Sequence, residues 1–140
     1  MPSNADGYAV DTSVAVAALD AGHAAHVVCR AAVVEHRPAL AGHAAFETYA
    51  VLTRMPGQLA IDSPTAAQVI AQLYPTTCWL DAETAASLLA RCGPIGIAGG
   101  AVYDALVAEA ARVDGRRLLT RDLRARRTYD LVGVEYEVVV

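Results

Sequence analysis

Short apolar runs alternate with longer stretches of helical periodicity along the chain. The apolar runs predict strands at 7–10, 76–80, 117–120 and 133–140. Between them, apolar positions recur at helical spacing, which predicts helices at 12–19, 24–36, 43–55, 64–73, 82–92 and 101–113. Strands that alternate with helices in this way indicate an α/β sandwich with a mostly parallel central sheet flanked by helices.

Capping residues and glycines set the boundaries of these elements. Asp11 or Thr12 can cap the first helix, and Asp81 can cap the fifth. Ser63 is the expected cap of the fourth helix, since Pro64 follows it in the first turn. The segment 93–100 holds four glycines and a proline and is predicted to be a loop. The 140 residues fit a single domain, 1–140, that can bury its own core.

Composition narrows the class of protein. Apolar residues make up 55% of the chain and charged residues 19%, which excludes a disordered chain. No apolar run reaches the length of a membrane span, and the first residues lack the order of a signal peptide, so we expect a cytoplasmic protein without a membrane partner. The three cysteines are odd in number and far apart, which favours buried apolar side chains over disulfides or a zinc site.

The basic residues are unevenly distributed. The net charge is −4, and all 11 basic residues are arginines. Seven of these arginines lie between residues 112 and 127, and the planar guanidinium suits phosphate. The cluster could therefore hold RNA on a mildly acidic protein, or it could be an ordinary solvated face. The candidates for gripping an RNA backbone are Arg121, Arg124, Arg126 and Arg127.

Two aspartates follow predicted strands. Asp11 comes directly after the first strand and Asp122 two residues after Thr120, at the carboxyl ends where open parallel sheets place their sites. Each residue alone could be only a helix cap or a turn residue.

Two further acids lie on predicted helices. Asp104 interrupts an apolar stripe of its helix, which is costly unless the carboxylate is paired or binds a metal. Glu47 lies in the middle of the third predicted helix, on a stripe that it shares with Arg54. A structural ion pair is the alternative explanation for both. Four carboxylates brought together would repel one another unless a divalent cation neutralised them, and oxygen ligands suit Mg²⁺, or Mn²⁺.

These residues carry a resemblance to a known family. The segments 10–13 (VDTS), 46–47 (FE), 99–106 (GGAVYDAL) and 118–122 (LLTRD) resemble PIN-domain nucleases, and the VapC-type toxins of bacterial toxin–antitoxin pairs are the most similar group. The resemblance covers the chain from Tyr8 to Val140 in order and spacing, with VDTS and LLTRD as its most specific parts.

The resemblance implies a PIN-like α/β/α fold and a metal-dependent endoribonuclease that cleaves RNA phosphodiester bonds by attack of an activated water. It implies an acidic cluster with two hydroxyl groups nearby, a homodimer and a cognate antitoxin protein as partner. The acids are Asp11, Glu47, Asp104 and Asp122, and the hydroxyl groups are those of Ser13 and Thr120. The alternative is an RNA- or protein-binding PIN-like module with a weak or inactive site.

Other features point to structure or to partners. A receiver domain needs a lysine, which the chain lacks, and the glycines at 93–100 do not follow a phosphate-binding pattern. His23 and His26 have no further ligand at metal spacing. Helices 24–36 and 62–73 are rich in alanine and valine, so we expect them in a homodimer interface or an antitoxin groove. Residues expected in the core or a dimer interface are Phe46, Tyr74 and Trp79.

Overall fold

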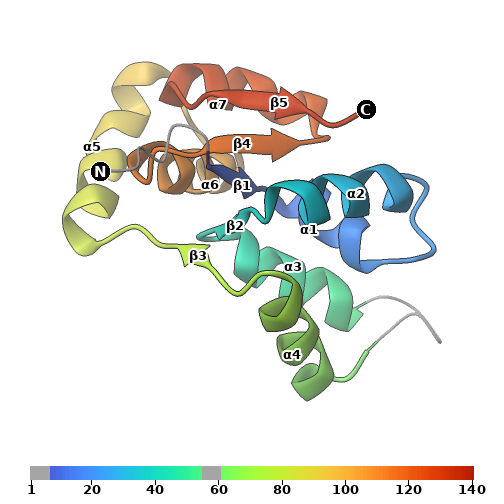
Figure 1. The fold of residues 1–140 in the computed structure, drawn as a ribbon. Coiled ribbons are helices and arrows are strands. Elements are labelled where there is room, and N and C mark those ends of the chain that lie inside the picture. Colours follow the sequence, from blue (N-terminus) through green and yellow to red (C-terminus); the bar gives the residue numbers. More distant parts are fainter. Residues whose placement is uncertain (1–6, 55–60) are drawn as a thin grey trace.

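The computed structural model describes residues 7–54 and 61–140. Helices and short strands alternate along the chain (Figure 1). In chain order they are β1 (Tyr8–Val10), α1 (Thr12–Leu19), α2 (His26–His36), β2 (Ala39–Ala41), α3 (Ala44–Arg54), α4 (Ser63–Leu73), β3 (Thr77–Cys78), α5 (Ala82–Ile95), α6 (Ala101–Val113), β4 (Arg117–Thr120), the short 3-10 helix η3 (Leu123–Ala125), α7 (Arg126–Val132) and β5 (Tyr136–Val138).

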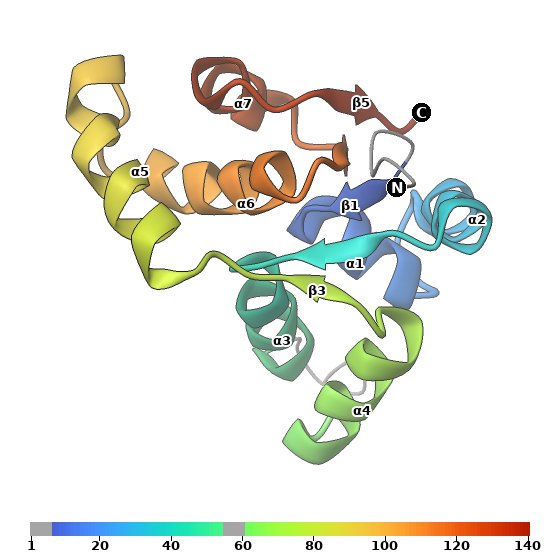
Figure 2. The ribbon, with the colours of Figure 1, turned by 60° about the vertical axis from the view of Figure 1, so that its left-hand side comes forward.

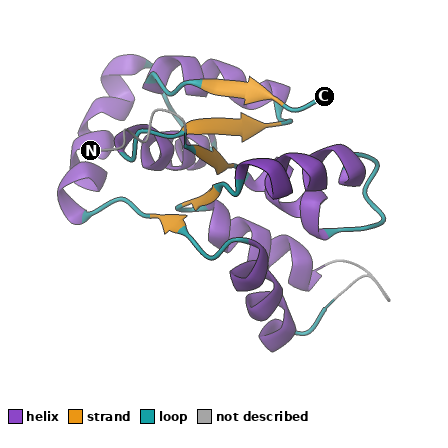
Figure 3. Cartoon of the chain, viewed as in Figure 1, coloured by secondary structure: helices purple, strands orange, loops and turns teal. Residues whose placement is uncertain are grey.

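The strands form one parallel sheet in the order β3-β2-β1-β4-β5. Figure 3 shows them as a thin layer between the helices. α1 packs against α2, α3 and α4, whereas α6 packs against α5 and α7. In Figure 2, α5, α6 and α7 lie on one side of the strands and α1 and α2 on the other. The predicted α/β fold with a parallel sheet flanked by helices is confirmed.

The parallel sheet brings distant segments to one edge. Because every strand runs in the same direction, the residues that follow β3, β2, β1 and β4 lie along a single carboxyl edge. The central strand β1 is buried at Ala9 and Val10, and its register pairs Val10 with Leu40 and Leu119. The edge therefore rests on a rigid, buried part of the molecule.

One strand of the sheet was not predicted. β2 has only three residues, between Pro38 and Gly42, and two of them are alanines. Its extended conformation is stabilised by pairing with β1 and β3 rather than by a local apolar pattern. The two edge strands of the sheet are also shorter than predicted: β3 is confined to Thr77–Cys78 and β5 to Tyr136–Val138.

The prediction of a loop throughout 93–100 is wrong. α5 continues through Pro94 to Ile95, and only then does Gly96 (φ 87°) end it in the left-handed conformation. The backbone N–H of Ile97 donates to the carbonyl of Cys92 at 2.8 Å, and Ile97 is buried. This closing turn satisfies the terminal carbonyls of Cys92 and Gly93.

Two helices after Asp122 were also not predicted. η3 and α7 occupy the arginine-rich segment, to which no element had been assigned from the sequence. Their buried residues, Ala125, Thr128, Tyr129 and Val132, recur at helical spacing. The polar arginines between them obscured this stripe. A smaller correction concerns α4, whose cap is Asp62 and not Ser63: the Asp62 carboxylate accepts from the Thr65 N–H at 3.0 Å.

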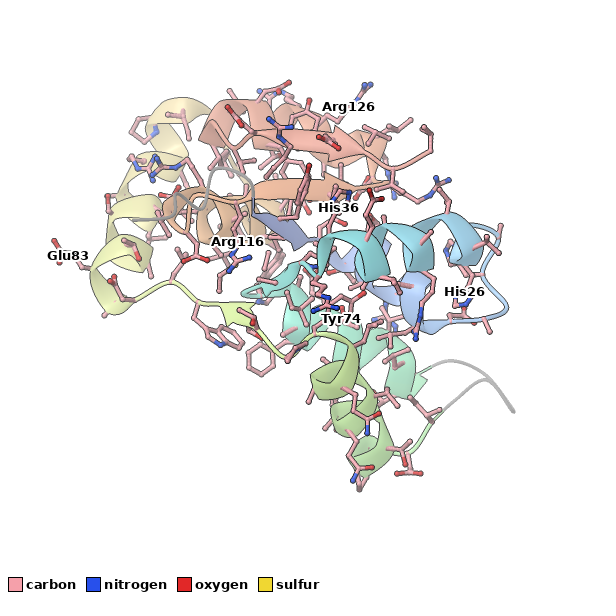
Figure 4. The ribbon with its side chains drawn as sticks, in the orientation of Figure 1. His26, His36, Tyr74, Glu83, Arg116 and Arg126 are labelled. Atoms are coloured by element: carbon pink, nitrogen blue, oxygen red, sulfur yellow. The ribbon has the colours of Figure 1, made fainter. Side chains whose placement is uncertain are left out.

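The core contains one buried ion cluster. Glu109 of α6 is buried and accepts from Arg91 of α5 and from Arg112 of its own helix. The contact with Arg91 joins α5 to α6, the helix that also carries Asp104. Elsewhere Tyr74, labelled in Figure 4, is buried and donates to the carbonyl of Ala15 at 3.2 Å, as expected for a core residue.

Composition led to expectations about the cysteines and about membrane-spanning helices. All three cysteines are free and buried, as predicted for apolar core residues. Among the described residues, no helix has the length and apolar character needed to cross a membrane.

Candidate active site

Asp11 occupies the centre of the carboxyl edge. It follows β1 directly and caps α1, where its Oδ1 accepts from the backbone N–H of Val14 at 3.3 Å. Of the two predicted caps, Asp11 and Thr12, the first is the one observed. Asp11 is only 4% exposed, and burial raises its pKa above the usual range. A carboxylate at this depth requires compensating donors.

Those donors come from three other side chains. Ser13 Oγ donates to Oδ1 of Asp11 at 2.5 Å, and Thr120 Oγ1 and the Tyr129 hydroxyl donate to Oδ2, the latter at 2.7 Å. Each of these hydrogen bonds lowers the pKa of Asp11 and so opposes the effect of burial. Together with the Val14 N–H they give each carboxylate oxygen two donors, which orients the Asp11 side chain firmly.

The two hydroxyl groups also order the chain around Asp122. Ser13 Oγ accepts from the backbone N–H of Arg121 at 2.8 Å, and Thr120 Oγ1 accepts from that of Asp122 at 3.0 Å. Asp122 caps η3, where its Oδ1 accepts from the Arg124 N–H at 3.0 Å. The segment after β4 is thereby fixed beside Asp11.

Glu47 and Asp104 approach from the helices on either side. Glu47 lies in the first turn of α3, not in the middle of the helix as predicted. Its Oε1 accepts from Thr12 Oγ1 at 3.1 Å. Asp104 lies in the first turn of α6. Within residues 7–54 and 61–140, neither acid takes part in an ion pair, so the structural alternative finds no support there.

The four acids line one pocket of about 520 Å³. Burial, and then the negative charges of Asp122, Glu47 and Asp11, raise the pKa of Asp104 to about 6. This shift reports that the four carboxylates share one electrostatic field. Two arginines, Arg54 and Arg124, line the same pocket and bring positive charge to it.

The donor set fits a hard divalent cation. All four side chains offer oxygen, and their mutual repulsion would be relieved by a bound positive ion. In the described part of the chain, no three acidic, histidine or cysteine side chains converge closely enough to form a ready-made metal site. The four carboxylates instead line the pocket from separate segments of the chain.

Tyr129 is a residue of the site that was not predicted from the sequence. It belongs to α7, is 1% exposed, and lines the acidic pocket while it donates to Asp11. Burial and the charge of Asp11 raise its pKa, so the hydroxyl keeps its proton and remains a donor. Its place in the buried stripe of α7 was the available signal, but that stripe does not reveal a contact with a residue near the start of the chain.

The candidate arginines and aromatic residues lie in different surroundings. Arg124 lines the acidic pocket, and it also lines a neighbouring hollow with Arg126 and Arg127. Arg121 instead donates to the carbonyl of Val139 at 2.6 Å. Phe46 and Trp79 are exposed, so they are not core residues.

Comparisons with known proteins agree with this geometry. The family described as PIN domain matches residues 8–131. Ribonuclease VapC27 of Mycobacterium tuberculosis (H37Rv) is 42% identical over 130 residues, which cover 93% of this chain and 95% of that protein. Ribonuclease VapC40 of Mycobacterium tuberculosis (CDC 1551 / Oshkosh) is 39% identical over 132 residues, 94% of this chain and 98% of that protein. The chain belongs to the PIN-domain family. No solved structure gives a significant match.

The shifted pKa of Asp104 predicts how the stability of this PIN domain depends on pH without metal. The pKa is about 6 in the folded protein, against an ordinary value of 3.8. Above pH about 6 the ionised carboxylate destabilises the folded state, and at pH well below 3.8 it is protonated in both states. In chelator, Asp104→Asn should therefore raise the urea midpoint at pH 7.5, and the gain should disappear by pH about 3.5.

Asp81→Asn is the matched control, because it removes one negative charge from an exposed cap whose pKa is lowered by its bonds to Thr84. This variant should show no gain at pH 7.5. A gain equal to that of Asp104→Asn would mean that net charge, rather than the acidic pocket, causes the effect.

The buried hydroxyl of Tyr129 predicts a loss of stability in Tyr129→Phe. A hydrogen bond to a charged group contributes about 1.5–3 kcal/mol, and Thr120 remains on the same oxygen, so we expect a loss of about 1–2 kcal/mol in urea unfolding at pH 7.5. Tyr136→Phe is the control, since Tyr136 packs beside Tyr129 with ring centroids 5.8 Å apart and is less buried, and its own hydroxyl bond goes to the exposed carboxylate of Asp130. Its loss should stay within about 0.5 kcal/mol. Equal losses in the two variants would contradict a specific bond to Asp11.

Proposed function

We propose that this PIN domain is a metal-dependent endoribonuclease whose site consists of Asp11, Glu47, Asp104 and Asp122. The observation that carries the proposal is the shared pocket: four carboxylates from four separate segments line it, and three of them raise the pKa of the fourth. A protein gains no stability from such an arrangement, so its presence favours chemistry. Family membership and the two relatives named as ribonucleases support RNA as the substrate.

The roles of the side chains follow from their surroundings. A bound divalent ion, Mg²⁺ or Mn²⁺, would lower the pKa of a coordinated water and would place positive charge beside the scissile phosphate. Asp11 is held by Ser13, Thr120 and Tyr129, so it is the most rigid of the four candidate ligands. The attacking water would lose a proton as its oxygen forms the new bond to phosphorus, the bond to the leaving ribose oxygen would break, and that oxygen would take up a proton.

The other acids complete this arrangement. Glu47 and Asp104 face the pocket from the first turns of α3 and α6, and Asp122 from the segment after β4. They would serve as ligands to the ion, and one of them would orient the attacking water.

We further propose a cognate antitoxin as the protein partner, on the strength of the resemblance to VapC-type toxins. α2 exposes Val27 (81%) and Val34 (62%). A separate groove of about 390 Å³ lies beside α4. Its apolar lining consists of Leu19, Leu52, Ile61, Val69 and Leu73. These surfaces fall within or beside the helices expected to bind a partner, and an apolar antitoxin segment suits them. A homodimer remains a prediction.

The proposed activity predicts cleavage of total RNA by the purified chain in Mg²⁺. Chelator should abolish this cleavage, and Asp104→Asn should lower the rate at least about 100-fold because it removes a metal ligand. Asp81→Asn should keep the wild-type rate, since Asp81 lies outside the pocket. RNA binding without any cleavage would instead support the alternative, a PIN-like binding module with an inactive site.

The arginines beside the pocket predict how RNA binding depends on salt. Arg124 is almost fully exposed and lines both the acidic pocket and the next hollow, which Arg126 and Arg127 also line. Figure 4 shows Arg126 on the α7–β5 side of the molecule. Phosphates that approach an acidic pocket need such flanking positive charge.

In an Asp104→Asn background, changing these three arginines together to alanine should weaken RNA binding. The slope of log affinity against log salt should fall by roughly 0.7 for each phosphate that the protein no longer neutralises. The control changes three arginines outside this region to alanine: Arg30, Arg37 and Arg117. Arg30 and Arg117 donate to other parts of the protein, and Arg37 lies at the end of α2. If both triple variants leave the slope unaltered, RNA does not pass over α7.

A further inference from the structure

Large aromatic side chains are exposed at the same edge as the acids. The chain has one phenylalanine and one tryptophan, and both are on the surface: Phe46 is 64% exposed and Trp79 54%. Tyr103 is 51% exposed. Rings of this size normally bury most of their area, so a group of exposed rings indicates a surface that binds something.

These rings form two pairs that meet at α3. Phe46 and Trp79 have ring centroids 5.6 Å apart at an interplanar angle of 57°. His43 and Tyr103 are stacked at 5.2 Å and 18°. We refer to His43, Phe46, Trp79 and Tyr103 as the aromatic rim.

Three residues of the aromatic rim lie close in sequence to acids of the pocket, although the rim does not itself line the pocket. Phe46 precedes Glu47, and His43 lies one helical turn before it. Tyr103 precedes Asp104 on α6. The His43–Tyr103 stack therefore joins the two helices whose first turns carry acids of the pocket.

The strand order sets the order of these side chains along the carboxyl edge of the sheet. Trp79 follows β3, Phe46 follows β2, and Asp11 follows β1. Asp122 and Arg124 follow β4. Along the carboxyl edge the side chains are therefore aromatic, then acidic, then basic. This order matches the parts of a nucleic-acid strand: bases have flat apolar faces, and phosphates seek cations.

We propose that the aromatic rim stacks unpaired bases of the RNA strand whose phosphates lie at the acidic pocket and Arg124. This proposal rests on the proposed ribonuclease function. Stacking on rings accepts any base, because every base has a π face, and it requires bases that are not already stacked in a duplex. The rival occupant is a second copy of this chain, covering Phe46 and Trp79 as a dimer interface.

Trp79 provides a direct probe, because it is the single tryptophan of the chain. In an Asp104→Asn background, a single-stranded RNA oligonucleotide should quench the fluorescence of Trp79. An abasic oligonucleotide of the same length carries the same phosphates and should leave the fluorescence unchanged. This readout needs no cleavage, so it remains informative even where the proposed catalysis fails.

Substitutions in the same background give the second readout. Phe46→Ala and Trp79→Ala should each weaken binding of the oligonucleotide about 5- to 100-fold, and Trp79→Phe should recover most of that loss. Leu89→Ala, at an exposed apolar residue of α5, is the control and should bind as the parent does. Far-ultraviolet circular dichroism checks that each variant is folded.

Sedimentation velocity on the same variants separates the two occupants. An unchanged sedimentation coefficient together with weakened RNA binding supports the aromatic rim as a base-stacking surface. Unaltered RNA affinity in folded Phe46→Ala and Trp79→Ala overturns the proposal. If these variants also dissociate from dimer to monomer, the rim is an interface between copies of the chain. Quenching and binding without RNA cleavage by the wild type would contradict the ribonuclease function but leave the stacking surface in place.

Discussion

The Asp11 carboxylate is only 4% exposed, and burying a charge to this extent is costly. The hydrogen bonds that offset this cost also determine the arrangement of much of the site. The donors to Asp11 come from α1, from the end of β4 and from α7. The charge at the end of β1 therefore joins the start of the chain to Thr120 and Tyr129, which are 109 and 118 residues away. Loss of any donor would leave part of a buried charge unsatisfied, so the fold and the orientation of Asp11 depend on the same hydrogen bonds.

The other three acids are held less tightly. Glu47 accepts from one hydroxyl, Asp122 accepts from the backbone N–H of Arg124, and Asp104 is constrained chiefly by its helix. A firm Asp11 surrounded by more adaptable carboxylates suits a pocket that is strained by like charges until a cation enters. The raised pKa of Asp104 is the measurable sign of that strain.

Local signals in the sequence were enough for some elements and not for others. The helices Thr12–Leu19 and Ala101–Val113 and the strand Arg117–Thr120 were predicted to the residue, because capping residues and apolar periods are contained within each segment. β2 could not be predicted, since its strand conformation comes from pairing with β1 and β3. Tyr129 was missed because its partner, Asp11, is 118 residues away. The four acids could be named from sequence only as a constellation that fits a known family.

α7 has two roles: one face contacts the buried Asp11, and the other carries exposed arginines. Its buried stripe holds Tyr129 against Asp11, and its exposed face carries Arg126 and Arg127. A helix is rigid over seven residues, so the hydrogen bond on one face fixes where the guanidinium groups emerge on the other. The arginine cluster is thus positioned by a buried contact with the acidic site and not by a flexible loop. Because the same sheet edge carries rings after β2 and β3, Asp11 lies between a basic and an aromatic surface whose order follows from the parallel strand order alone.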